Sequence, residues 1–384
     1  MIILIIISFI LCFIYLYIIL LLYKGLKNTK KILLTSKSPN NNCFSVIISA
    51  HNEENNLARC LESVVWQSIG NQRYEIIVVN DRSTDATEKI AKDFAAKYNN
   101  ISVINISNTP DGFSPKKYAV SVGIKNAKNE IIVFTDADCI VPFEWLETID
   151  KYFDKNTALV QGITSYEYTP FMNKLFFSLQ SIDFISHGIV SASAIGANIP
   201  INSNANNFAF RKIAFEEMGG YGDKKLVISG DDDLLLQKIW HSKKWQIKFM
   251  ADIKAKVKTM PTKNINLVFE QRKRWGSKTI YYNLPQRIML SSIFIFYLFI
   301  FVNLILSIIS PLFLFIFFIV FILKFIGELI LMIPGLNLFD EKKLKKYIIL
   351  ASLIHLPFII ASVIFGVFGK FRWKEQIFKR EINC

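Results

Sequence analysis

Three long apolar runs stand out along the chain, and they predict membrane-spanning segments at both ends. Residues 2–22 are almost all Ile, Leu, Phe and Tyr with no charge, long enough to cross a bilayer as a helix. Residues 288–323 are too long for one span, and a tight turn at Ser310–Pro311 would divide them into two. The third run, 347–369, carries Pro357 in its middle, so a full span and a kinked re-entrant segment both fit it.

Between the first two runs the pattern changes to short apolar runs that alternate with amphipathic stretches. Segment 44–67 is typical of a buried strand, a polar turn and an amphipathic helix that places Leu57, Leu61, Val64 and Val65 on one face. The same order of strand, polar loop and helix follows in segment 74–98, with further strands predicted in segments 101–107 and 130–138 and a helix at 115–127. Strands that alternate with helices predict an α/β fold with a doubly wound, mostly parallel sheet.

These patterns divide the chain into five parts. We expect an N-terminal anchor (1–23), a basic juxtamembrane linker (24–42), an α/β domain (43–270), an interfacial segment (271–287) and a C-terminal membrane region with two to three apolar segments (288–384). Lysines follow the first span directly, and Lys beside a span marks its cytoplasmic side. The α/β domain should therefore lie in the cytoplasm. The basic segment 370–380 fits this rule only if residues 347–369 do not cross fully.

Composition narrows the class of protein further. The chain has 384 residues and a formal net charge of +14, which lysines and arginines next to membrane segments explain through contact with anionic lipids. We find no nucleic-acid recognition module or aromatic-basic platform, so no nucleic-acid partner is expected. The five cysteines show no paired spacing, and in a cytoplasmic domain they should be free thiols that form neither disulfides nor a zinc site.

Acidic residues follow the predicted strands. Asp136 and Asp138 come directly after a buried apolar run, on the same side of the strand end. Two carboxylates so close together repel each other unless a cation lies between them. Asn52-Glu53-Glu54 and Asp81 follow two other strands, and the carboxyl ends of parallel strands form one rim where ligands bind. The residues alone leave two interpretations open: strand ends followed by turns, where Asp is common, and a rim of carboxylates that binds a cation.

Five motifs in order carry a resemblance to a known family: "VIISAHNEE" (46–54), "IIVVNDRSTDAT" (76–87), "FTDAD" (134–138), "SGDDDLLLQKI" (229–239) and "QRKRW" (271–275). Together they resemble the family 2 glycosyltransferases with a GT-A fold. More closely, they resemble its membrane-bound branch, which includes cellulose, chitin, hyaluronan and poly-N-acetylglucosamine synthases. The resemblance implies inverting transfer of a sugar from a nucleotide-diphosphate donor, most often a UDP-sugar.

The resemblance also implies roles for residues on the donor side. Asp138 would bind Mg²⁺ or Mn²⁺ directly, with Asp136 contacting the ribose and the metal, and such hard cations suit a leaving diphosphate. Asp81 would read the uracil or ribose edge, and Glu53 would help to close the nucleotide pocket. Lys116 matches a lysine that meets the diphosphate, although two solvated lysines at a helix start explain Lys116 and Lys117 almost as well. Asp85 is better explained as a helix cap.

On the acceptor side, Asp231, Asp232 and Asp233 precede an apolar helix where the family has an acidic pair. We predict Asp232 as the general base, with Asp231 as the alternative and Asp233 as the helix cap. Arg211 resembles an acceptor-side arginine. The motif "QRKRW" would bring Gln271 and Arg274 to the diphosphate and Trp275 to the acceptor sugar. The alternative is an interfacial membrane segment, in which Arg, Lys and Trp are all frequent.

These features favour a membrane-anchored, metal-dependent glycosyltransferase that acts on a growing polysaccharide or a glycolipid. The small number of predicted spans favours a lipid acceptor or a homo-oligomer, because one chain would lack the helices for a wide channel. Single-sugar transfer to a lipid carrier and an inactive membrane scaffold are the rival functions. A transporter is disfavoured because Lys324, Glu328 and Pro357 are the main interruptions in the spans.

Overall fold

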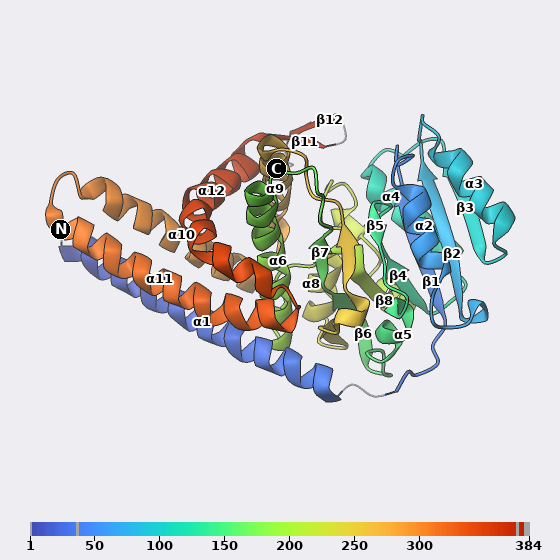
Figure 1. Ribbon diagram of the computed structural model, residues 1–384, viewed down its shortest axis with the longest axis horizontal. Coiled ribbons are helices and arrows are strands. Elements are labelled where there is room, and N and C mark those ends of the chain that lie inside the picture. Colours follow the sequence, from blue (N-terminus) through green and yellow to red (C-terminus); the bar gives the residue numbers. More distant parts are fainter. Residues whose placement is uncertain (1, 36–37, 374–375, 380–384) are drawn as a thin grey trace. The chain divides into compact units, whose positions relative to one another are not determined.

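The chain forms two compact units, which we name and describe one at a time. The computed structural model describes residues 2–35, 38–373 and 376–379 (Figure 1). The α/β unit comprises Thr29–Thr169 and Pro200–Pro261, and the helical unit comprises Met1–Asn28, Pro170–Ile199 and Thr262–Cys384. Each unit is therefore assembled from segments that lie far apart in the sequence.

A seven-stranded sheet runs through the described part of the α/β unit. Its strands are β1 (Phe44–Ala50), β2 (Tyr74–Asp81), β3 (Ile101–Ile106), β4 (Ile131–Phe134), β6 (Thr157–Gly162), β8 (Phe208–Arg211) and β9 (Gln246–Met250). They lie in the order β3-β2-β1-β4-β8-β6-β9. The first four are mutually parallel, β8 is antiparallel to β4 and β6, and β9 is parallel to β6. The predicted α/β fold with a mostly parallel sheet is confirmed.

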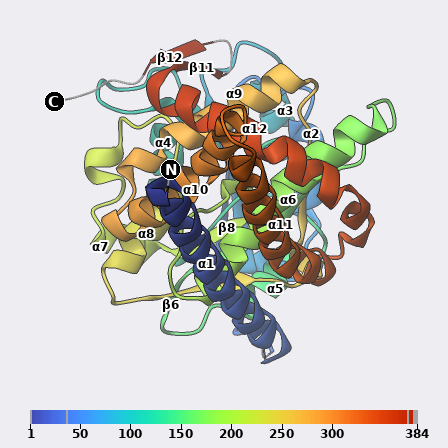
Figure 2. The same cartoon turned by 90° about the vertical axis from the view of Figure 1, so that its left-hand side faces the viewer.

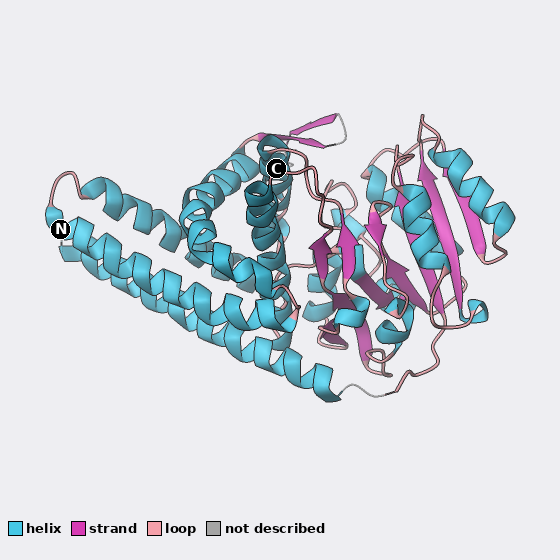
Figure 3. Cartoon of the chain, viewed as in Figure 1, coloured by secondary structure: helices cyan, strands magenta, loops and turns pink. Residues whose placement is uncertain are grey.

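Helices cover both faces of the parallel half of the sheet, as Figure 3 shows. They are α2 (Leu57–Val65), α3 (Thr87–Lys97) and α4 (Pro115–Asn126). Side chains alternate along a strand, so Val46 and Ile48 face the core formed with α2 and α3. On the other face, α4 comes so close that a Cβ at Gly123 would lie 2.6 Å from the side chain of Ile47. The sheet is therefore covered on both sides, as a doubly wound fold requires.

Smaller elements complete the α/β unit. A second sheet has the order β5-β10-β7, and its β10 places Thr259 opposite Cys139. The elements are β5 (Cys139–Ile140), β7 (Thr164–Tyr166), β10 (Val257–Thr259), α5 (Trp145–Asp150), α7 (Lys212–Glu217) and α8 (Asp233–His241). Short 3-10 turns are η1 (Asn71–Arg73), η2 (Ala205–Asn207), η3 (Gly222–Lys224) and η4 (Ile253–Ala255).

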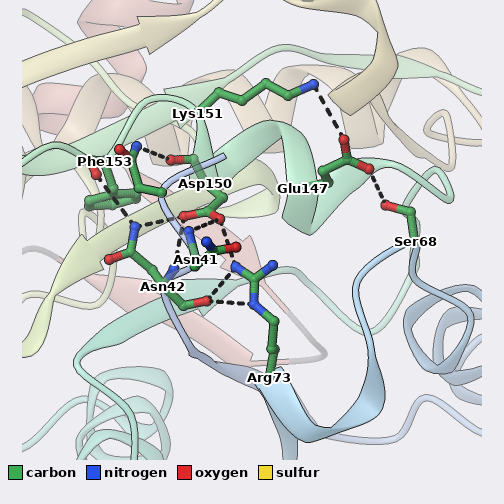
Figure 4. A network of polar contacts seen from close by, with 9 residues as sticks. Asn41, Asn42, Ser68, Arg73, Glu147, Asp150, Lys151 and Phe153 are labelled. Atoms are coloured by element: carbon green, nitrogen blue, oxygen red, sulfur yellow. Dashed lines mark hydrogen bonds and ion pairs between the residues drawn. The ribbon is translucent and has the colours of Figure 1, made fainter. Parts of the chain in front are cut away.

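A buried carboxylate binds the segment that precedes β1 (Figure 4). Asp150, at the end of α5, is fully buried and accepts hydrogen bonds from the backbone N–H groups of Asn41 and Asn42 at 2.9 and 3.2 Å. Arg73 completes its coordination through an ion pair of 2.7 Å. Because these partners satisfy the buried charge, the polar segment 40–42 is held in one position immediately before β1.

The helical unit contains the long apolar helices. They are α1 (Ile2–Thr35), α6 (Lys174–Gly196), α10 (Leu284–Leu306), α11 (Pro311–Leu338) and α12 (Ile348–Phe368), with the more polar α9 (Ile265–Ser277) and η5 (Thr279–Tyr281) before α10 and η6 (Lys342–Tyr347) before α12. A hairpin of β11 (Lys370–Trp373) and β12 (Gln376–Lys379) follows. Within the described residues, five helices, counting η6 with α12, are long and apolar enough to cross a membrane.

Close packing joins these helices. Figures 1 and 2 show α1 beside α11, and a Cβ at Gly327 of α11 would lie 3.1 Å from the Tyr15 ring of α1. Tyr15 also stacks on Phe296 of α10, with 4.5 Å between ring centroids. In α11, Lys324 is fully buried and bonds Glu328 at 2.8 Å and the hydroxyl of Ser352 on α12 at 2.9 Å. Its charge is thus satisfied between helices, as a charge buried among apolar helices must be.

Two boundaries differ from the sequence prediction. Helix α1 continues to Thr35, through most of the basic segment expected to be a linker (24–42), because lysine and leucine there are good helix formers. Helix α6 groups with the helical unit and interrupts the α/β domain expected at 43–270. Its Ser, Asp and His residues lower its hydropathy, so it did not stand out as an apolar run. The turn at Ser310–Pro311 is confirmed, and α12 continues through Pro357.

Candidate functional site

The acidic segments after β1, β2 and β4 meet at one edge of the sheet. The strands are in register, with Ala50 opposite Asn80 and Ile47 opposite Phe134. Hydrogen bonds tie the first two loops together, from the Asn52 N–H to the Ser83 hydroxyl at 3.1 Å and from the Glu54 N–H to Asp85 at 3.1 Å. Asp85 also accepts the Thr87 N–H at the start of α3, which agrees with the predicted capping role. The polar rim is therefore formed as expected.

Asp138 lies beside two other carboxylates of this rim, those of Asp136 and Glu53. Burial, together with the charges of Asp136 and Glu53, raises the pKa of Asp138 to about 6. Thr259 of β10 donates its hydroxyl to the Asp138 carboxylate at 3.3 Å, which fixes the carboxylate's direction. Because the charges of Asp136 and Glu53 raise the cost of ionising Asp138, this is a place where a cation would be stabilised.

Lys116, in the first turn of α4, connects the rim to the acidic segment before α8. Its ammonium lies 3.0 Å from Asp136 and 3.4 Å from Asp231. Although burial opposes the charged form, these two carboxylates raise the pKa of Lys116 above its ordinary value. The lysine is therefore a charged bridge between two of the predicted site residues, and the alternative of a solvated helix start does not describe it.

The three consecutive aspartates have separate positions. Asp231 faces Lys116, as described above. Asp232 is the N-cap of α8, and its side chain accepts the N–H of Asp233 at 2.8 Å. Asp233 is fully buried and accepts the backbone N–H of Ser203. We expected Asp233 to be the cap, and the structure places that role one residue earlier, because the helix begins at Asp233 itself.

Lys117 is a buried residue of this region to which the sequence assigned no role. It is 1% exposed, and its ammonium donates to the carbonyl groups of Lys224, Val227 and Ser229 at 2.7, 2.7 and 3.3 Å. Two adjacent lysines at a helix start can both reach solvent, so the sequence carried no signal that one of them is buried. Nothing in the pattern told which of the two was buried.

Glu53 and Asp81 lie at the rim with partners of their own. The Glu53 carboxylate accepts the side-chain amide of Asn56 at 2.9 Å, and its charge acts on Asp138. Asp81, at the end of β2, is 4% exposed and accepts hydrogen bonds from Nε and Nη2 of Arg82 at 2.8 and 3.2 Å. Arg82 adopts a positive φ of 54°, which brings its side chain back onto Asp81. A nucleotide that used Asp81 would have to share it with Arg82.

Arg211 is not brought to this edge. It is opposite Ile131, at the start of β4, whereas Asp136 follows the end of the same strand. Its guanidinium donates to the carbonyl groups of Thr157 and Asp154 at 2.9 and 2.7 Å and pairs with Glu130. The acceptor-side role expected from the resemblance is therefore not supported by its position, since β8 runs antiparallel and carries Arg211 to the opposite end.

In the helical unit, the "QRKRW" segment lies on α9, and its best-buried member is Arg272. This arginine pairs with Asp183 of α6, donates to the Gln271 side chain at 2.6 Å, and lies 4.1 Å from the Trp275 ring centroid. Trp275 also meets the ring of His187 edge-on at 5.1 Å. Gln271 and Trp275 are thus held by Arg272, a residue that the sequence analysis did not single out. Arg274 lies half-buried on the same helix.

Among the residues that the structure describes, no three His, Cys, Asp or Glu side chains are arranged to hold a metal ion by themselves. Asp136 and Asp138 nevertheless fit a hard divalent cation, because they offer oxygen ligands and their repulsion is relieved by positive charge. Oxygens of a bound diphosphate would have to complete the coordination. Cys12, Cys43, Cys60 and Cys139 are free thiols, as predicted, and Cys384 lies outside the described residues.

The sequence of the α/β domain is similar to those of known proteins. Residues 45–214 match the model of glycosyl transferase family 2. The chain is 30% identical to Glycosyltransferase AglE of Haloferax volcanii over 125 residues, 32% of this chain and 40% of that protein. It is 30% identical to the probable glycosyltransferase YdaM of Bacillus subtilis over 192 residues, 47% of this chain and 43% of that one. The chain thus spans less than half of the length of these relatives.

A solved structure shares the fold over almost the whole chain. It is a mannosyltransferase, PcManGT from Pyrobaculum calidifontis, in complex with GDP-Man and Mn²⁺, with a TM-score of 0.57 and 16% identity over 94% of this chain and 98% of that one. At this identity the likeness concerns the fold, and it agrees with the expected GT-A architecture. Together with the match over residues 45–214, it shows that this chain contains a domain similar to glycosyl transferase family 2, within a fold of the GT-A type.

Proposed function

We propose that the chain transfers a sugar, with inversion at the anomeric carbon, from a nucleotide-diphosphate sugar to a hydroxyl of a membrane-associated acceptor. The observation that carries this proposal is the Lys116 bridge, because its ammonium joins Asp136 of the donor side to Asp231 at 3.0 and 3.4 Å. An inverting transfer needs a cationic site for the leaving group and a carboxylate base nearby. The family 2 domain supports the reaction class.

On the donor side, Asp138 and Asp136 would hold Mg²⁺ or Mn²⁺, and the ion would supply positive charge to the leaving diphosphate. Lys116 would turn its ammonium to the same phosphates. The start of α4 adds to this attraction, because a helix N-terminus favours anions. The buried hydroxyl of Ser114, which precedes that helix, has no hydrogen-bond partner among the described residues, so it is free to donate to a phosphate oxygen.

For the general base we propose Asp231, with Asp232 as the alternative, which reverses the preference drawn from the sequence. The Asp232 carboxylate is occupied as the cap of α8 and is 7% exposed. Asp231 is joined through Lys116 to the donor side, and a base must lie within hydrogen-bond reach of the acceptor hydroxyl when the sugar bond forms. When Lys116 moves to the diphosphate, the Asp231 carboxylate would lose this ion pair and could take that proton.

The nucleotide and the acceptor are proposed more broadly. UDP is the expected nucleotide, and GDP deserves equal testing because PcManGT was solved with GDP-Man. Glu53 and Asp81 remain our proposed nucleotide contacts. The apolar helices support an acceptor in the membrane, a glycolipid or a growing polysaccharide. We propose that Gln271 and Arg274 contact the diphosphate and that Trp275 contacts the acceptor sugar. The α/β unit would lie in the cytoplasm. The chain would act alone or as a homo-oligomer.

The test is a screen of the detergent-purified full chain against UDP- and GDP-sugars with Mn²⁺ or Mg²⁺, with release of the nucleoside diphosphate as the readout. Asp138→Asn and excess chelator should each abolish release, and Asp231→Asn should reduce transfer about a hundredfold or more. Asp93→Asn, an exposed change on α3, is the matched control and should retain activity. NMR of the product should show an inverted anomeric configuration.

Other results would point elsewhere. Full activity in excess chelator would refute the metal role. No release with any donor would favour the inactive scaffold. A dead Asp232→Asn beside an active Asp231→Asn would return the base to the position predicted from the sequence.

A further inference from the structure

The segment from Gly222 to Gly230, which leads directly into Asp231, has little regular structure of its own. It begins with the short turn η3 and ends at Gly230, whose φ is +83°. Its internal hydrogen bonds are turn contacts such as that from the Val227 N–H to the Lys224 carbonyl at 3.2 Å. A segment of this kind needs contacts from elsewhere to present one side chain in one direction.

Those contacts come from the first turn of α4. The N–H of Ser114 donates to the carbonyl of Lys225 at 2.8 Å. Lys117 donates to three carbonyls of the segment, those of Lys224, Val227 and Ser229, and three is the number of protons that an ammonium carries. The ring of Tyr221 lies 5.6 Å from the same ammonium. A 1% exposed lysine is therefore fully satisfied by the backbone of the segment.

The neighbouring lysine acts on the end of the same segment. Lys116 binds the Asp231 carboxylate, two residues after the last carbonyl that Lys117 holds. Successive residues of a helix point in different directions. Lys117 of α4 can therefore bind the backbone of the segment while Lys116 binds the Asp231 carboxylate. The direction of Asp231 thus depends on two adjacent side chains with separate tasks.

We propose that Lys117 is a positioning residue for the group that takes the acceptor proton: it fixes the carbonyls of residues 224–229 and thereby aims Asp231. The inference rests on the proposed function, since it assigns Asp231 as the base. Without the ammonium, three carbonyls would lose their donor, and the segment would shift towards water. A displacement of about 1 Å at a reacting group lowers turnover on the order of a hundredfold.

The test compares three variants of the full chain in detergent. Lys117→Met removes the donors and keeps the aliphatic stem, whereas Lys117→Arg keeps the charge in a planar group that cannot meet the same three carbonyls equally. Lys212→Met is the matched control, because Lys212 also donates to a backbone carbonyl, that of Ala127 at 2.9 Å, away from the Asp231 segment. We expect Lys117→Met to lower kcat for transfer at least tenfold and Lys117→Arg to lower it less. The donor KM should stay within about twofold, and Lys212→Met should keep its kcat.

Two further readouts separate positioning from general destabilisation. Hydrogen exchange of amides 224–230 should accelerate in Lys117→Met and stay unchanged in Lys212→Met. In an Asp231→Asn background, Lys117→Met should cause no further loss of the residual turnover, because both changes remove the same function.

The outcomes distinguish this inference from the function on which it rests. Absence of transfer by the wild type with every donor refutes the proposed function and this role with it. Transfer by the wild type with an unchanged kcat in Lys117→Met refutes the positioning role alone. Unchanged exchange of amides 224–230, or full additivity with Asp231→Asn, likewise overturns it.

Discussion

Replacing Asp138 with asparagine is expected to stabilise the metal-free protein while it abolishes sugar transfer. In the folded chain, burial and the charges of Asp136 and Glu53 raise the pKa of Asp138 from 3.8 to about 6. That difference corresponds to about 3 kcal/mol of destabilisation at neutral pH. Asparagine removes the charge and keeps an oxygen for the Thr259 hydroxyl, which lies 3.3 Å away. Since its amide must also be buried, we expect a net gain of about 1–2 kcal/mol.

The pH dependence of this gain follows from the sign of the shift. Because the pKa of Asp138 is higher in the folded state, the folded protein binds more protons there, and the wild type loses stability as pH rises from about 4 to about 6. The advantage of Asp138→Asn should therefore be small near pH 4 and complete above about pH 7. For a unit the size of the α/β unit, each kcal/mol shifts the thermal midpoint by about 2–4 °C.

The assay is the thermal midpoint of the detergent-purified full chain in chelator, at pH 4.5 and pH 8. Asp154→Asn is the control with the opposite sign. Although burial opposes it, hydrogen bonds from Lys248 and Thr157 hold the pKa of Asp154 below its ordinary value, so its carboxylate stabilises the fold above about pH 4. Mn²⁺ with nucleotide should raise the midpoint of the wild type and leave that of Asp138→Asn unchanged. A midpoint lowered at pH 8 by Asp138→Asn would refute the reasoning.

Three other changes test separate parts of the structure. Asp150→Asn should lower the free energy of unfolding by about 3 kcal/mol, because asparagine offers one oxygen where the buried carboxylate offers two to its hydrogen-bond donors. A thermal midpoint equal to that of the wild type would contradict this. Arg211→Met should lower stability by about 1–3 kcal/mol through two lost carbonyl bonds and leave the acceptor KM unchanged, and a raised acceptor KM would restore the acceptor-side role. Trp275→Ala should reduce transfer more than hydrolysis of the donor by water, and an equal reduction of both would assign the ring to packing with Arg272.

The fold of the α/β unit could be predicted because its strands are short apolar runs in a regular order. The run at 101–107 became β3 within a residue of its expected bounds, and the strand expected to begin the segment at 44 became β1. The rim followed from the same pattern, since parallel strands end together and the acidic residues come directly after them. Hydrophobic periodicity and strand ends are properties of local sequence, so no long-range information was needed.

Other features depend on contacts between distant segments. Helix α6 was missed because polar residues such as Asp183 interrupt its apolar pattern, and Asp183 is paired with Arg272, 89 residues later. The burial of Lys117 depends on carbonyls more than 100 residues away. Arg211 was misplaced because a motif gives a residue's neighbours in sequence and not the direction of its strand. Polar residues in buried places are decided by partners that single-sequence patterns do not reveal.

The charge of the whole chain would have suggested the wrong environment for the site. The net charge is +14, yet the rim brings together the carboxylates of Glu53, Asp136 and Asp138, and Lys116 is the cation shown between this group and Asp231. A diphosphate approaching alone would meet a negative surface. It would be attracted only if a divalent ion arrived with it or before it, and only if Lys116 exchanged its carboxylate partners for phosphate. The same exchange would take Lys116 away from Asp231 when a donor is in place. Under the proposed function, one lysine between two carboxylates would therefore couple occupation of the donor site to the action of the base.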